Sequence, residues 1–222
     1  MNRQSNEINN LKEQNKILLE EIKNIKQQCQ LKETKFGNNI CIKSAIMKEN
    51  EFDYIKDAIE FRLNKKIKEI IKLYQASIDG GEVSAFHSKC DNIPNTLTII
   101  KSEGNKRFGG FTSLTWESSY SNKWKDDKNA FLFSLDKKQI YPYKNSDKRA
   151  ICCNRYQGPC FGNGHDIGII GNIIKETKLY TYEWYQNDCS FDYKGDSKAL
   201  SEDGTGKRFM ALEYEVFNII FN

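Results

Sequence analysis

From residue 96 onward, short strand-like segments alternate with turn residues, and this pattern limits the fold more than any other feature of the chain. Apolar residues in these segments recur with a period close to two, as in β-strands. Two hairpins and four further strands are predicted: 96–102 with 106–113, 130–135 with 139–143, and then 150–154, 166–170, 179–185 and 210–220. Many short strands without alternating helices favour a sandwich or a barrel-like pair of sheets over βαβ units.

One long helix is predicted ahead of these strands. From Phe52 to Tyr74 apolar residues recur every three or four positions, which is the spacing of a helix with one buried face. Asn50 stands where a residue would cap the N-terminus of this helix, and Asp79 and Gly80 stand where it would end. The pattern therefore predicts an α+β fold, in which a sandwich or a barrel-like pair of sheets packs with a flanking helix.

Residues 1–36 have a different character, with no proline and no glycine, and with no aromatic residue before Phe36. They carry a heptad pattern whose seam positions are Ile8, Leu11, Asn15, Leu18, Ile22, Ile25 and Cys29. A polar Asn at an a position favours a register-fixed, parallel, two-stranded coiled coil. We expect residues 1–36 to form a homodimeric coiled coil, residues 37–44 a linker and residues 45–222 a folded domain. A single solvated helix is the alternative for the first segment.

Charge and hydrophobicity exclude several classes of protein. The 34 Lys and Arg residues against 30 Asp and Glu give a net charge of +4, which tolerates a polyanionic partner without requiring one. No apolar run approaches the roughly 20 residues of a membrane-spanning helix, and no signal-like apolar segment follows Met1. The seven cysteines have no C-x-x-C spacing, so we expect reduced, mostly buried thiols in a cytoplasmic protein.

Two carboxylates on the last predicted strand are candidate catalytic residues. Glu213 and Glu215 are two positions apart on the last predicted strand, so they share a face at a separation of roughly 7 Å. Such a pair can act in glycoside hydrolysis. The preferred interpretation is the polar face of a half-buried strand, and a hydrolytic or cysteine-based redox enzyme remains the first alternative function.

Metal and nucleotide sites are not expected. His87 and Cys90 lie three residues apart, but the remaining cysteines do not supply the paired spacing of a structural zinc site. The segment 162–166, Gly-Asn-Gly-His-Asp, does not complete a phosphate-binding glycine motif. It is interpreted as a tight turn in which His165 or Asp166 bonds nearby backbone. We expect no metal and no cofactor.

A surface for single-stranded nucleic acid is the second alternative. Basic and aromatic residues alternate in two segments, with Trp116, Tyr120, Lys123, Trp124 and Lys125 in the first and Arg155 and Tyr156 in the second. Acidic residues directly follow the first segment, and only Arg3 precedes the heptads, so a basic-region zipper is not supported. A nucleic-acid-binding dimer therefore remains only the second alternative function.

Short motifs then occur in a characteristic order. They are Tyr74-x-Ala76-Ser77-x-Asp79-Gly80, Phe86-His87-x-Lys89-Cys90-Asp91, Arg107-Phe108-Gly109-Gly110-Phe111-Thr112-Ser113 with Trp116, Gly158-Pro159-x-Phe161-Gly162-x-Gly164-His165-Asp166-Ile167, and Glu213-Tyr214-Glu215-Val216-Phe217. From about residue 45 to the C-terminus this succession resembles the TLDc domain family, although 175–206 departs from the family pattern. The motif positions are Asp79, Gly80, Phe86, His87, Cys90, Asp91, Gly109, Gly110, Trp116, Gly162, Gly164, His165, Asp166, Glu213 and Glu215.

The resemblance implies two antiparallel sheets packed as a sandwich with flanking helices, and no settled catalytic mechanism. It also implies roles in resistance to oxidative stress and, in several members, binding to the vacuolar proton ATPase. The abundance of Asn, Lys and Ile and the coiled coil ahead of the domain are similar to protist members. The expectation is a non-enzymatic protein-interaction module, dimerised by residues 1–36.

Overall fold

The computed structural model describes residues 13–16, 18–21, 23, 42–48, 50–163, 165–171, 189–196, 198–200 and 210–222. The chain divides into two compact units, Met1–Ile40 and Cys41–Asn222. Across these described ranges, no helix combines the length and the apolar character that a bilayer span requires.

The first unit is helical where it is described, at 13–16, 18–21 and 23. Asn15 is exposed there, and the side chains of Leu18 and Leu19 are 54% and 61% exposed in the single chain. The remaining predicted seam positions, Ile8, Leu11, Ile22, Ile25 and Cys29, lie outside the described residues. The coiled coil therefore stays a prediction.

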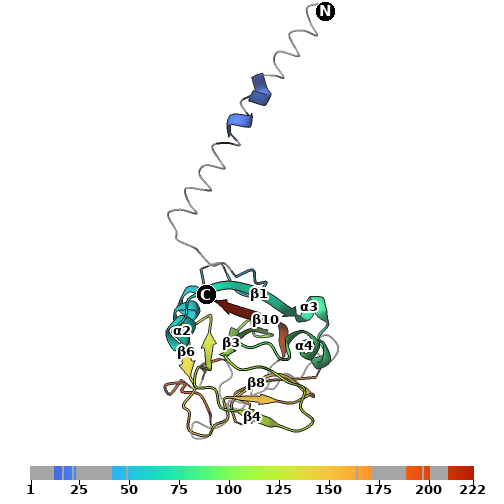
Figure 1. Ribbon diagram of the computed structural model, residues 1–222, viewed down its shortest axis with the longest axis vertical. Coiled ribbons are helices and arrows are strands. Elements are labelled where there is room, and N and C mark those ends of the chain that lie inside the picture. The colour runs from blue at the N-terminus through green and yellow to red at the C-terminus, as the bar shows by residue number, and fades with distance from the viewer. Residues whose placement is uncertain are drawn as a thin grey trace, which may run out of the picture. The chain divides into compact units, whose positions relative to one another are not determined.

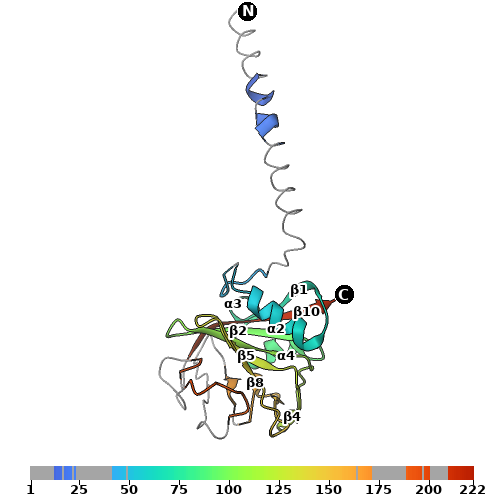
Figure 2. The same ribbon diagram turned by 90° about the vertical axis from the view of Figure 1, so that its left-hand side faces the viewer.

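The second unit contains two antiparallel sheets, which lie one above the other in both views (Figures 1 and 2). The six-stranded sheet has the order β1 (Ile67–Gln75), β10 (Ala211–Phe221), β2 (Thr96–Ser102), β3 (Arg107–Thr112), β5 (Phe131–Ser134) and β6 (Gln139–Pro142). The four-stranded sheet has the order β4 (Lys123–Lys125), β7 (Ile151–Cys153), β8 (Gln157–Phe161) and β9 (Ile167–Ile170).

A buried cluster draws side chains from both sheets. Tyr74, Ile100 and Tyr214 come from the first sheet, and Ile151 and Phe161 from the second. Since burial of such side chains is the main favourable contribution to folding, this shared core holds the sheets together. The arrangement is compatible with the predicted sandwich.

The other face of the six-stranded sheet packs on helix α2 (Asp53–Leu63), which lies at one side of the domain in Figure 1. Ile55 and Ile59 of α2 are fully buried, and the Arg62 guanidinium lies 5.5 Å from the centre of the Phe131 ring. The Tyr54 hydroxyl donates to the backbone oxygen of Ser134 at 2.9 Å. Helices α3 (Ala76–Asp79) and α4 (Val83–Cys90) follow β1 and lie at the opposite side of the domain (Figure 1).

Most of the predicted strands are confirmed. Strands β2 and β3 form the first predicted hairpin, and β5 and β6 form the second. Strands β7, β9 and β10 occupy the predicted segments 150–154, 166–170 and 210–220 to within a few residues. The predicted strand 179–185 lies outside the described residues.

The predicted long helix is wrong beyond Leu63. Asn64 takes the left-handed conformation with φ of 50° and ends α2, and Ile67–Gln75 then pairs with β10. Two irregularities in that pairing shift the in–out alternation of β1, so its apolar residues acquire helix-like spacing. Asn50 does not cap α2 either, because the N-cap position is Phe52 and no side chain caps the helix.

The sequence pattern also missed several short elements. Strand β8 was not predicted because it contains Gly158 and Pro159, and both residue types normally interrupt strands. Strand β4 has three residues, and helices α3 and α4 have four and eight, which is too short for a periodicity to show.

Candidate protein-interaction surface

Three motif residues belong to the core. Phe86, Cys90 and Trp116 are at most 1% exposed, and the Trp116 ring makes edge contacts with Phe86 and Phe161. Its Nε1 donates to Thr96 Oγ1 at 2.8 Å. Burial raises the pKa of the Cys90 thiol far above its usual range and so favours the neutral thiol.

Gly109 and Gly110 are needed because of close packing. A Cβ on Gly109 would lie 1.9 Å from the backbone oxygen of Thr98, and one on Gly110 would lie 2.7 Å from Phe161 Cζ. Strand β3 therefore approaches both its neighbour strand and the second sheet more closely than any larger residue permits.

His87 and Asp91 join helix α4 to the four-stranded sheet. His87 Nδ1 lies 2.7 Å from Asp91 Oδ1, and Nε2 lies 3.1 and 3.0 Å from the backbone oxygens of Asn154 and Gln157. The second Asp91 oxygen accepts from Ser118 Oγ at 2.7 Å. These contacts fix the β7–β8 turn against the segment before β4, and they give His87 and Asp91 a positioning role.

Asp79 is the last residue of α3, and Gly80 is its C-cap, close to the corner where β1 leads into α3. Asp79 Oδ2 accepts from the Gln75 backbone N–H at 2.8 Å, and Lys89 Nζ lies 3.0 Å from Oδ1. The backbone hydrogen bond from Gln75 and, after it, the bond from Lys89 lower the pKa of the Asp79 carboxyl. Gly80 has φ of 104°, which favours glycine, and its backbone oxygen accepts from the Tyr74 hydroxyl at 2.6 Å.

Asp166 is buried in the turn before β9, as the tight-turn interpretation predicts. It accepts from the Ser190 backbone N–H at 3.1 Å and from the Tyr193 hydroxyl at 3.0 Å. Burial raises the pKa of Asp166 to about 7, against the lowering effect of these two bonds. Gly162 has φ of 79° and leaves no room for a Cβ beside Asp166, while Gly164 lies outside the described residues.

The paired carboxylates of β10 differ from their predicted setting. Glu215 is fully buried rather than on a polar face, and this part of the prediction is wrong. Its oxygens accept from Ser44 Oγ, from the Ala45 backbone N–H at 3.0 Å and from Lys72 Nζ at 2.5 Å. The segment 42–48, in which the sequence showed no pattern, supplies two of these donors.

Glu213 is half-buried and also bonds within the protein. It accepts from the Ser77 backbone N–H at 3.2 Å and from Gln75 Nε2 at 3.3 Å. Gln75 Oε1 in turn accepts from Lys72 Nζ at 2.7 Å. Both carboxylates are therefore held in one structural network with β1 and the start of α3, which explains them without catalysis.

The structure brings together three soft ligands that the sequence did not associate. Ligand atoms of Cys152, Cys160 and His165 all lie within 4.8 Å of one another, and neither His87 nor Cys90 belongs to this group. A hydrogen bond from Cys160 lowers the pKa of the Cys152 thiol, whereas burial raises that of Cys160. Cys153 lies apart, in the core.

An exposed aromatic and cationic cluster lies where β4 and the β7–β8 turn approach each other. The Arg155 guanidinium lies 4.5 Å from the centre of the Tyr120 ring and 5.5 Å from that of Tyr156. The side chains of Tyr120 and Tyr156 are 81% and 65% exposed. We refer to Tyr120, Arg155 and Tyr156 as the tyrosine–arginine stack. Trp116, which the sequence grouped with these residues, is buried instead.

Local hydrogen bonds fix the backbone of the stack. The Arg155 N–H donates to the Ser119 backbone oxygen at 2.8 Å, and the Tyr156 N–H donates to Asn154 Oδ1 at 2.9 Å. Asn154 Nδ2 also donates to Asn122 Oδ1 at 2.7 Å. Two loops far apart in the sequence therefore present the three side chains together.

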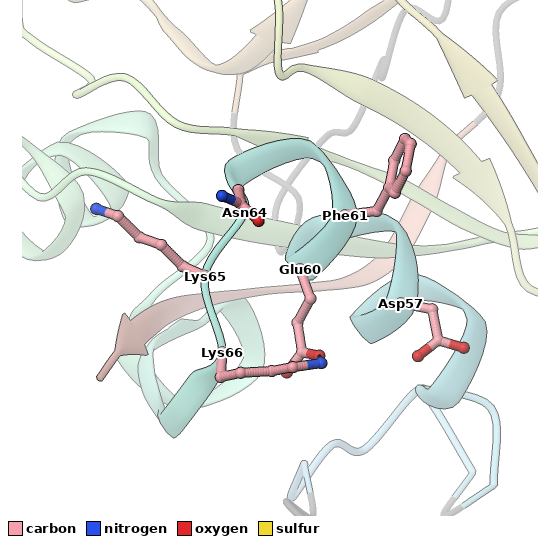
Figure 3. Close-up of a pocket in the computed structure, with 6 residues that line it drawn as sticks. All are labelled: Asp57, Glu60, Phe61, Asn64, Lys65 and Lys66. Carbon is pink, nitrogen blue, oxygen red and sulfur yellow. Dashed lines mark hydrogen bonds and ion pairs between the residues drawn. The ribbon is translucent and has the colours of Figure 1, made fainter.

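A second surface feature lies at the end of α2 (Figure 3). This open hollow of about 390 Å³ is lined by Asp57, Glu60, Phe61, Asn64, Lys65 and Lys66. Lys66 Nζ lies 2.6 Å from Glu60 Oε2, and Glu60 Oε1 accepts from the Ile67 N–H at 3.0 Å, so these polar groups stabilise the α2–β1 connection. The Phe61 side chain is 87% exposed.

Comparison with known proteins places this domain in a family. No curated protein matches the chain. The model of the TLDc domain matches residues 40–220, which is most of the chain and includes both sheets and their helices. The order of motifs, the two antiparallel sheets and this match agree, and the chain belongs to the TLDc domain family.

Proposed function

We propose that this protein is a non-enzymatic protein-interaction module that binds a protein partner through the tyrosine–arginine stack. The observation that supports the proposal most strongly is the exposure of two tyrosines whose ring centres lie 4.5 and 5.5 Å from the Arg155 guanidinium. Tyrosine and arginine are among the residues most enriched at the energetic centres of protein interfaces. Because hydrogen bonds fix the backbone that carries Arg155 and Tyr156, less loop ordering is required on binding.

The chemistry of the stack favours a partner that supplies a carboxylate. Within the described part of the chain, no side chain accepts a hydrogen bond from the Arg155 guanidinium. Arg155 is exposed, so its N–H groups are accessible to an acceptor on a partner. A guanidinium binds a carboxylate with two parallel hydrogen bonds, which fixes orientation as well as adding affinity.

Single-stranded nucleic acid fits this surface less well. Lys123 and Lys125 lie 2.8 and 3.3 Å from Glu117 Oε1, so the nearby lysines are already paired. A polyanion-binding groove needs several cations along the path of the backbone. One arginine between two tyrosines is better suited to a single acidic side chain.

The enzyme alternative has less support. The buried network around Glu215 and the bonds to Glu213 account for both carboxylates. Cys90 is buried with a raised pKa, and His87 is held by Asp91 and two backbone oxygens. These contacts support structural roles.

Membership of the TLDc family supports the finer proposals. We propose a cytoplasmic role in resistance to oxidative stress, with subunits of the vacuolar proton ATPase as the candidate partner. We propose further that residues 1–36 pair two chains as a coiled coil, which would present two stacks in one dimer and increase avidity for a multisubunit partner.

Affinity capture with the full-length protein tests the proposal. Wild type, Arg155→Ala and Tyr156→Ala would be compared in nuclease-treated lysate, with captured proteins quantified by mass spectrometry. Phe61→Ala is the matched control, since it removes another exposed aromatic side chain on α2. We expect the two stack variants to lose specific partners at least about tenfold and Phe61→Ala to retain them. Equal capture by all four proteins would contradict the proposal.

A further inference from the structure

A row of residues crosses the outer face of the four-stranded sheet. Ile151 and Cys153 point into the core, so Cys152 between them points to the opposite face. Cys152 pairs with Trp124 of β4, and the Ile151–Phe161 pair makes Cys160 its neighbour on β8.

The row continues to β9, where the paired residue is a glycine. Cys160 pairs with Gly168, and a Cβ on Gly168 would lie only 3.1 Å from the Cβ of His165 and 3.2 Å from its Cδ2. The missing side chain therefore provides the space in which the imidazole lies beside the Cys160 sulfur. Cys152, Cys160 and His165 meet as a result of strand register and this one glycine.

We propose that Cys152, Cys160 and His165 form a binding site for a thiophilic divalent cation, Zn²⁺. Two thiolates and an imidazole are ligands that zinc prefers. Tetrahedral geometry with Zn–S bonds of about 2.3 Å places two sulfurs about 3.8 Å apart. The ligand atoms are already within 4.8 Å of one another, so a small side-chain adjustment closes the site.

The surroundings suit the ion. Cys152 and Cys160 are fully buried and lie outside the cluster that contains Cys90 and Cys153, so they face away from the core that the two sheets share. His165 is half-buried, and a water would complete the four ligands of a tetrahedral site. Gln157 Oε1 of β8 lies 3.1 Å from His165 Nε2, and this contact helps to fix the position of the imidazole.

The consequence is a cross-link in a part of the four-stranded sheet whose strand pairing is irregular. The β8–β9 ladder is irregular between Gln157 and Cys160, and β7 and β8 pair at Ile151 and Phe161. Zinc would join β7, β8 and the turn before β9, and binding would displace the two thiol protons to the buffer. The sheet that carries Arg155 and Tyr156 would then be stabilised by the metal.

Cobalt substitution of the full-length protein, kept reduced with a phosphine, provides the test. We expect one equivalent of Co²⁺ to produce the near-ultraviolet thiolate-to-cobalt band, Zn²⁺ to abolish it by competition, and proton release to accompany binding. Cys152→Ala and Cys160→Ala should lose the band. Cys153→Ala is the matched control on the same strand and should keep it, because that thiol points into the core.

Two further variants keep both cysteines and so keep the test valid if a cysteine variant fails to fold. His165→Ala should weaken cobalt binding at least about tenfold in competition with a chelating dye, and Gly168→Ala should weaken it by displacing the ring. Zinc should raise the melting temperature of wild type and Cys153→Ala but not of Cys152→Ala. No band in reduced wild type, or a band that Cys152→Ala and Cys160→Ala leave unchanged, would overturn the assignment.

Discussion

Lys72 Nζ lies 2.5 Å from Glu215 Oε1, and this ion pair joins the edge strand β1 to β10. Glu215 is fully buried and Lys72 is 31% exposed. Ser44 and the Ala45 N–H supply the remaining donors to the carboxylate. A buried carboxylate with all its partners is tolerated, but removing one partner leaves an uncompensated group in the interior.

Lys72→Met should therefore destabilise the protein by about 3 kcal/mol, because it leaves the Glu215 charge buried without its cation. Urea unfolding measures the change. Glu213→Gln is the control, since it alters a half-buried carboxylate two residues away and should cost about 1 kcal/mol or less. A Lys72→Met protein as stable as wild type would show that the pair contributes nothing.

Substitution of Gly109 tests the close approach of β3 to β2. Gly109→Ala should prevent folding or cost more than about 3 kcal/mol, because the new Cβ would lie 1.9 Å from the Thr98 backbone oxygen. Gly104→Ala, in the adjoining turn, meets nothing closer than Ser102 Oγ at 3.9 Å and should leave the melting temperature nearly unchanged. Equal melting temperatures for both variants would be incompatible with this packing.

Asp79 should make stability depend on pH in the acid range. Its folded pKa lies below the ordinary value of about 3.9 because of the hydrogen bonds from Gln75 and Lys89. A carboxyl with a lowered folded pKa adds stability that is complete above the unfolded pKa and is lost as the pH falls through the folded pKa. Asp79→Asn should therefore reduce the loss of stability below about pH 4 relative to wild type. Urea titrations at several pH values would reveal the difference, and identical slopes in the variant and wild type would count against it.

Residues 1–36 should make the full-length protein a dimer at tens of micromolar. Leu18→Asp with Ile22→Asp should give monomers, because two charges per chain would enter the predicted seam. Asn15→Ile should raise the thermal stability of the assembly and admit trimers, since it removes the polar residue that favours two strands. Sedimentation equilibrium separates these states, and a monomeric wild type would leave a solvated helix as the description of this segment.

The hairpins were predictable because their turns contain residues typical of turns and their strands have a clear period. Strand β1 was not, since two pairing irregularities give its apolar residues the spacing of a helix. The pairing of residues 67–75 with β10 decides that this segment is a strand and not a helix, and a local sequence pattern does not reveal that pairing.

The sequence predicted some residues of the candidate sites correctly and misplaced others. The sequence identified Tyr120, Arg155 and Tyr156 as exposed aromatic and basic residues, but it grouped them with Trp116, which packs in the core. Burial of Glu215 depends on a segment 170 residues away in the sequence. Such long-range contacts follow from topology and register rather than from composition.

The central claim is that the tyrosine–arginine stack binds a protein partner. Its most direct test is the ratio of dissociation constants of Arg155→Ala and wild type for the most enriched captured protein, measured with purified components. The account predicts a ratio of about ten or more for Arg155→Ala and a ratio near one for the Phe61→Ala control. A ratio near one for Arg155→Ala, with both variants folded, would contradict the account.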